Sequence, residues 1–112
     1  MTGTIAIEKL DILKDEIVDR LNGAVNTLRT MASDNLASLE TQERLTRKAD
    51  GVQAVLDAQS ERLVNVSSVE NAYIITEFIR IEAEDKNTDV KAGMMLARGY
   101  VLEYLYVAAH TS

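Results

Sequence analysis

Apolar side chains recur at alternating steps of three and four residues from Ile7 to Val66. This spacing predicts an amphipathic helical region over residues 5–65, with one apolar face and one charged face. Gly23 lies inside this region, and a glycine in a helix interior can mark a close approach of two helices. We expect helix–helix contacts along the apolar seam, at Leu10, Ile17, Leu21, Leu28, Met31, Leu45, Val52, Leu56 and Leu63.

The pattern weakens in the middle of this region, around Ser33–Asn35. Three consecutive seam positions are polar there, and the apolar residues are displaced by one position (polar Asn35, Ser38 and Gln42; apolar Leu36 and Leu39). Either the helix continues through a local stutter, or the chain turns back into an αα-hairpin. The continuous helix is slightly favoured, because no Gly or Pro is present and the seven-residue frame resumes at Leu45.

This alternative decides the kind of molecule. A continuous helix over residues 5–65 would be about 90 Å long and would need oligomeric partners to cover its seam. A polar layer at Asn35, Ser38 and Gln42 would then fix the register between those partners. A turn would instead give a compact four-helix bundle.

The chain from residue 68 to 110 is expected to form a helical hairpin. Ser67 followed by Glu70 fits a capping box, which predicts a helix start near Ser68. Residues 72–84 are rich in β-favouring side chains, so a strand is the alternative, although no hairpin-type turn residues accompany them. As a helix, the segment would bury one broad face, formed by Val69, Ala72, Tyr73, Ile75, Thr76, Ile79 and Ala83.

A turn at Asp85–Asp89 precedes the last predicted helix, over about residues 90–109. Asn87 or Thr88 can cap this helix. The expected fold is therefore all-α: a long amphipathic N-terminal helix, continuous or broken near Ser33–Asn35, and two shorter C-terminal helices. Together they would form a helical bundle or coiled coil in a single domain, residues 1–112.

Composition agrees with this expectation. The chain has 46% apolar and 27% charged residues, which excludes a disordered tail, and it has no proline to interrupt long helices. The absence of cysteine excludes disulfides and thiolate metal sites. No apolar run is long enough to span a membrane, and the N-terminus lacks a signal-peptide pattern. We expect a cytoplasmic protein, with assembly into a larger particle or non-classical export left open.

Eighteen acids and twelve bases give a net charge of −6, which disfavours binding to nucleic acid. Arg44, Arg47 and Lys48 form the only basic cluster. These three residues either pair with acids on a neighbouring helix, such as Glu40 and Glu43, or contact a phosphate group or an acidic partner.

Residue patterns typical of enzymes are missing. The lone histidine, His110, is close to the C-terminus, where chains commonly fray. Neither a Glu-x-x-His metal motif nor a glycine-rich phosphate loop occurs. We therefore predict no catalytic residues, no cofactor and no metal site, and we interpret the acid pairs as solvated helix faces.

All five aromatic residues lie in the C-terminal third of the chain. They either pack in the core or contribute to an interface, where tyrosine is enriched. Tyr100, Tyr104 and Tyr106 cannot all face one way on a helix, so at least one should be exposed.

These features favour a non-enzymatic, self-assembling structural or scaffold subunit that acts through helix–helix contacts. The alternative is a compact four-helix adaptor, chaperone or inhibitor with an acidic surface that binds one protein partner. The expected partners are the chain itself, another protein, or both, and neither nucleic acid nor a membrane. No motif assigns the chain to a family.

Overall fold

The computed structural model describes the backbone of residues 7–66 and 69–111 and the side chains of residues 15–66 and 70–106. Four helices make up the described chain: α1 (Ile7–Ala32), α2 (Leu39–Val64), α3 (Val69–Ala83) and α4 (Thr88–Thr111). The all-α prediction is confirmed for these residues, and residues 72–83 are helical rather than a strand. The predicted Ser67 cap and the side chains of Leu10 and His110 lie outside the described residues.

The chain turns back between Ala32 and Leu39. The continuous helix that the heptad frame favoured is therefore wrong, and the αα-hairpin is correct. The polar positions in this stretch build a turn instead of a buried polar layer between subunits. Leu36 and Leu39 are 95% and 70% exposed, so the displaced apolar positions are not part of the core.

Polar side chains form this turn without any glycine or proline. The Asp34 carboxylate accepts a hydrogen bond from the Leu36 amide at 2.9 Å, which makes an Asx turn. Ser38 is the N-cap of α2, and its hydroxyl accepts from the Thr41 amide at 3.2 Å. The Gln42 amide donates to the Asp34 and Ala37 carbonyls at 2.9 and 3.1 Å. Local side-chain hydrogen bonds thus satisfy backbone groups that a straight helix would have paired itself.

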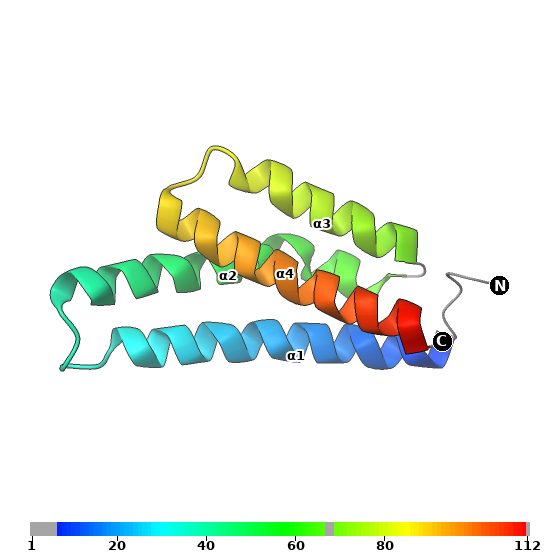
Figure 1. Cartoon of the computed structure of the whole chain (residues 1–112), viewed down its shortest axis with the longest axis horizontal. Helices are drawn as coiled ribbons and strands as arrows, with labels where there is room; N and C mark the ends of the chain where they lie inside the picture. Colours follow the sequence, from blue (N-terminus) through cyan, green and yellow to red (C-terminus); the bar gives the residue numbers. More distant parts are fainter. Residues whose placement is uncertain (1–6, 67–68, 112) are drawn as a thin grey trace.

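The four helices pack as a compact bundle (Figure 1). Helices α1 and α2 lie side by side as the hairpin, α4 crosses them diagonally, and α3 lies on the outer side of α4. The bundle has a Cα radius of gyration of 15.1 Å and extends 52 Å along its longest axis. Its core contains buried apolar residues from all four helices, including Leu21, Val52, Leu63, Ile79, Met94 and Val101.

Helices α2 and α4 approach each other closely at Gly51 and Gly93. The close approach predicted at Gly23 is wrong, because a Cβ placed there would have no atom within 4 Å. Gly23 lies on the exposed part of α1, outside its packed face. The helix crossing, and not the presence of a glycine, decides where backbones come close.

Candidate protein-interaction surface

Helix α3 presents apolar side chains to solvent as well as to the core. Tyr73, Ile74, Phe78 and Ile81 are between 41% and 53% exposed, and we call these four residues the α3 surface. Ile74, Phe78 and Ile81 follow the spacing i, i+4, i+7, so they form one stripe along the helix. An exposed apolar stripe of this kind is typical of an interaction site. Tyr73 lies about 100° around the helix from Ile74, on the side of Glu77, so it borders the stripe.

The opposite face of α3 is the buried one. Ala72, Ile75, Thr76, Ile79 and Ala83 are each at most 3% exposed, as the helical pattern predicted. Tyr73 was predicted to belong to that buried face, and this is wrong: its side chain is 51% exposed. The reason is that α3 packs mainly on α4 and only slightly on α2, so no other described helix covers the side that carries Tyr73.

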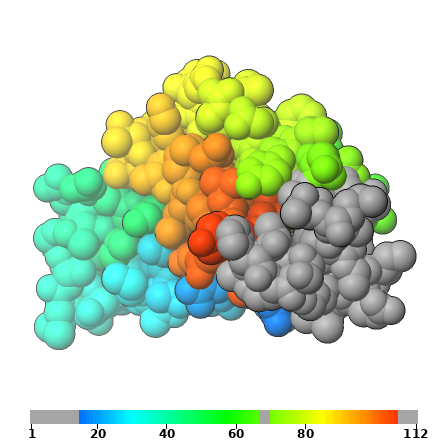
Figure 2. Space-filling view, turned by 45° about the vertical axis from the view of Figure 1, so that its right-hand side comes forward, coloured from blue at the N-terminus to red at the C-terminus, as the bar shows by residue number. Residues whose placement is uncertain are grey.

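The α3 surface belongs to a helix that is hydrogen-bonded to α4 and lies at the outside of the bundle. The Arg98 guanidinium of α4 donates to the Thr76 carbonyl at 3.1 Å, and the Thr76 hydroxyl donates to the Tyr73 carbonyl at 2.7 Å. The first bond links α4 to the middle of α3, and the second lies within α3. Figure 2 shows α3 in yellow-green at the outer surface of the molecule, above α4.

Charged side chains flank one side of the α3 surface as a network. Arg80 lies between Glu77 and Glu84, at 2.8 and 3.1 Å, and Arg98 approaches Glu77 at 3.7 Å. The hydrogen bond to Glu77, with the charge of both carboxylates, raises the pKa of Arg80 above its usual range. The guanidinium of Arg80 is therefore already engaged within the helix.

The other charged groups around the α3 surface are arranged differently. The Arg62 guanidinium of α2 stacks over the Phe78 ring, 4.8 Å from its centroid, and donates to Gln59 at 3.0 Å. Glu70 and Glu82 are exposed carboxylates of α3 that make no ion pair with another described residue. An open hollow continues from Ile81 into the α3–α4 turn, and it is lined by Ile81, Glu82, Glu84, Asp85 and Lys86.

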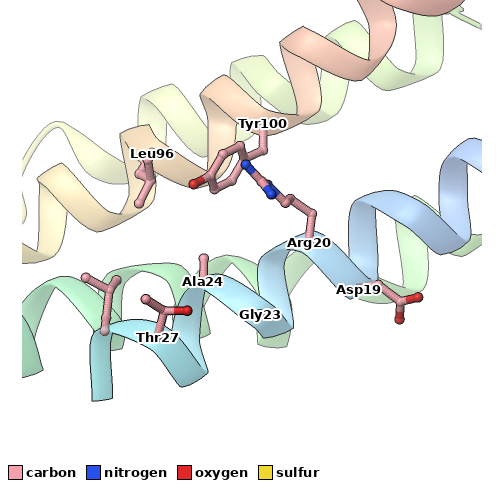
Figure 3. A pocket seen from close by; sticks show the side chains of 8 residues that line it. Asp19, Arg20, Gly23, Ala24, Thr27, Leu96 and Tyr100 are labelled. Carbon is pink, nitrogen blue, oxygen red and sulfur yellow. The ribbon is translucent and has the colours of Figure 1, made fainter. Parts of the chain in front are cut away.

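A second concave feature lies between α1 and α4 (Figure 3). This groove has a volume of about 450 Å³, and small residues such as Gly23 and Ala24 contribute to its α1 side. At one end the Arg20 guanidinium stacks on the Tyr100 ring, 4.8 Å from its centroid. Asp19 also borders the groove, although its side chain points away from Tyr100 in Figure 3. The groove combines one base, one acid and a few apolar atoms, so it indicates no particular ligand.

The predicted seam is covered by the chain's own helices. Ile17, Leu21, Leu28, Val52, Leu56 and Leu63 are all buried, because α2 folds back onto α1 and α4 covers both. Leu45 is half-buried, Met31 is 48% exposed near the turn, and Leu10 has no described side chain. In this structure the seam is the core of one chain.

The predicted basic cluster meets an acid from a distant part of the sequence. Arg47 contacts the Asp89 carboxylate at 2.8 Å, and Arg44 contacts it at 3.4 Å. The hydrogen bond from Arg47, followed by that from Arg44, lowers the pKa of Asp89. A phosphate or acidic-partner contact by Arg44, Arg47 or Lys48 stays a prediction, and such a ligand would compete with Asp89 for the two guanidinium groups.

The three tyrosines of α4 have different environments. Tyr106 is 64% exposed, whereas Tyr100 and Tyr104 are partly buried and pack against the core. At least one of the three was expected to be exposed, and Tyr106 is. An interface formed by these tyrosines stays a prediction. The exposed aromatic residues of α3, Tyr73 and Phe78, lie on the α3 surface.

Sequence reasoning missed Ile74 and Ile81, but a signal for them was present. Both residues fall outside the predicted buried face of α3, so an apolar side chain there had to be exposed or covered by something else. Eight of the thirteen residues 72–84 are also apolar, more than one helix face can bury.

No protein-family model matches the chain, and no curated protein or solved structure is significantly similar to it. The described residues define a compact all-α bundle of four helices with an exposed apolar helix face. Over its described residues, no helix has an apolar stretch long enough to cross a membrane. In the same residues, no group of three or more His, Cys, Asp or Glu side chains could hold a metal ion.

Proposed function

We propose that the chain is a small, non-enzymatic binding module that recognises one protein partner through the α3 surface. The observation that carries this proposal is the exposure of Tyr73, Ile74, Phe78 and Ile81 on one well-packed helix. Aromatic and large aliphatic side chains on a rigid helix are suited to be anchors of an interface, because little conformational entropy is lost when they are covered.

The self-assembling scaffold subunit, which the sequence favoured, has lost the observation that motivated it. A long helix with an uncovered seam would have required other subunits, but α2 and α4 cover the seam of α1 within the same chain. The compact fold therefore supports the adaptor, chaperone or inhibitor. Which of these three roles applies depends on the partner.

Site-specific photocrosslinking in cells that make the protein tests the proposal. We would introduce p-benzoylphenylalanine at Phe78 in one variant and at Leu36 in a control, because Leu36 is an even more accessible apolar residue on the distant α1–α2 turn. The expected result is a crosslink from position 78 to one other protein, and no such crosslink from position 36.

The crosslinked protein would then be purified and titrated against wild-type chain and Ile74→Ser. Truncating an anchor of an interface commonly costs more than about 1 kcal/mol, so we expect an affinity loss of roughly tenfold or more. Equal crosslinking from both positions, or unchanged affinity of Ile74→Ser, would overturn the proposal. A crosslink from position 78 to a second copy of the chain would restore self-assembly as the function.

A further inference from the structure

We infer that the partner presents an amphipathic helix whose apolar stripe is flanked by Lys or Arg residues. This inference rests on the proposed function of the α3 surface and adds the chemistry of the partner. Two observations carry it: the helical spacing of the anchors on α3, and the carboxylates Glu70 and Glu82, which make no ion pair with another described residue.

The shape of the α3 surface fits a second helix. Ile74, Phe78 and Ile81 span about two helical turns, roughly 10 Å, along a single line. A helix laid along this line can place its own residues at i, i+4 and i+7 against the stripe, as in other helix–helix packings. No described helix covers Ile74 and Ile81, since α3 packs mainly on α4 and only slightly on α2, whose Arg62 lies over Phe78.

The charge around the stripe favours a basic partner. The five carboxylates of residues 69–86 stand near four bases: Arg80 and Lys86 of the same segment, Arg62 of α2 and Arg98 of α4. Of these carboxylates, Glu70 and Glu82 make no ion pair with another described residue, and Glu82 also lines the hollow beside Ile81. That hollow has three carboxylates and one base, so it suits a lysine or arginine side chain of the partner.

A second copy of the chain fits this surface less well. Arg62 is stacked on Phe78, and Arg80 is held between Glu77 and Glu84, so neither guanidinium is available to a copy without losing its present contacts. Lys86 is the remaining base near the stripe, and it stands beside Asp85 and Glu84 in the hollow. Two such surfaces placed face to face would bring like charges together, which opposes association.

Two synthetic helices of identical apolar stripe test this inference. One carries Lys at the four positions that flank the stripe, and the other carries Glu there. Each would be titrated into the full-length chain, with affinity measured by fluorescence anisotropy and the site located from backbone amide chemical shifts. We expect the Lys-flanked helix to bind at least tenfold more tightly than the Glu-flanked helix, with chemical-shift changes centred on residues 70–86. Its affinity should fall as the salt concentration rises.

Charge reversal on the chain provides the matched control. Glu82→Lys should lower the affinity for the Lys-flanked helix several-fold and raise the affinity for the Glu-flanked helix. Glu103→Lys, an exposed residue of α4 that makes no ion pair with a described residue, should leave both affinities unchanged. Both substitutions are at exposed positions, so the fold should tolerate them.

The outcomes separate this inference from the proposed function. Equal binding of the two helices at α3 would overturn the basic-partner inference and leave the α3 surface as the binding site. Failure of both helices to bind, alongside a specific crosslink from position 78, would also overturn only the inference. Failure of both helices together with no crosslink would overturn both, and a dimer that covers α3 would replace the basic helix with a second copy.

Discussion

Gly51 of α2 and Gly93 of α4 meet at the point where the two helix backbones touch. A Cβ on Gly51 would overlap the Val90 carbonyl oxygen and would lie 3.0 Å from the Gly93 Cα. A Cβ on Gly93 would overlap the Lys48 carbonyl oxygen and would lie 3.1 Å from the Gly51 Cα. The atoms in the way are backbone atoms, which cannot rotate aside, so each position needs the absence of a side chain.

Substitution of either glycine should therefore destabilise the bundle. We expect Gly51→Ala and Gly93→Ala each to lower the free energy of unfolding by about 1–3 kcal/mol, because α2 and α4 must move apart. Gly23→Ala and Gly99→Ala are the matched controls, since a Cβ at either position meets no atom within 4 Å. They should stabilise by roughly 0.5–1 kcal/mol through helix propensity. Urea unfolding of the four variants measures these changes in the free energy of unfolding. Equal effects at all four positions would contradict a close approach of α2 and α4 at Gly51 and Gly93.

Asp89 should make the stability of the bundle depend on pH in the acid range. Arg47 and Arg44 lower its pKa in the folded chain, so the unfolded chain binds a proton more readily. The stabilisation is therefore complete above the unfolded pKa of about 3.9 and is lost as the pH falls through the lower, folded pKa.

Comparison with Asp89→Asn isolates this contribution. Wild-type chain should be more stable than the variant at pH 7, and the difference should shrink below about pH 4. Glu103→Gln, which removes an exposed carboxylate of the same helix, should show a smaller difference. Thermal unfolding of the three chains across pH gives the result. A difference between wild type and Asp89→Asn that does not change with pH would argue against the ion pair.

Gln59 and Gln42 are both polar positions of the seam, yet we expect opposite effects from replacing them. Gln59 is 1% exposed, and its amide nitrogen has no hydrogen-bond partner among the described residues. Gln59→Met keeps the volume and removes this unpaired donor; it also removes the hydrogen bond that Gln59 accepts from Arg62, whose exposed guanidinium can bond to water instead. We therefore expect a net stabilisation of less than about 1 kcal/mol. Gln42→Met removes the two hydrogen bonds that hold the α1–α2 turn and should destabilise by about 1–2 kcal/mol. Chemical unfolding distinguishes them; a large loss in Gln59→Met would mean that its amide is paired in solution.

Leu36 and Leu21 provide a test of which leucines form the core. Leu21 is fully buried, so Leu21→Ala should cost about 2–5 kcal/mol, a large part of the stability of a small domain. Leu36 is 95% exposed at the turn, and Leu36→Ser should change stability by less than about 0.5 kcal/mol. Both variants can be compared by thermal unfolding. A substantial loss in Leu36→Ser would show that the turn packs against something.

The sequence by itself determined the secondary structure and most of the buried positions. The periodicity of three and four residues placed Ile17, Leu21, Val52 and Leu63 on the apolar face. Such a face can be recognised from the sequence without knowing which element packs against it. Asn87 was identifiable as a cap because a cap acts on the amide two residues away, and its side chain accepts from Asp89 at 2.9 Å. These are local relationships within a few residues of the chain.

Tertiary structure alone decided the turn at Ser33–Asn35, because the local sequence pattern there fits both a continuous helix and a turn. Folding α2 back onto α1 buries both halves of the seam in one chain, and this gain is invisible in the local pattern. The same holds for the partner of Arg47, which comes from Asp89 far along the sequence, and for the glycine pair at the α2–α4 crossing. Which apolar face of α3 stays exposed was likewise set by what packs against it: α4 covers one side, and Ile74, Phe78 and Ile81 remain outside.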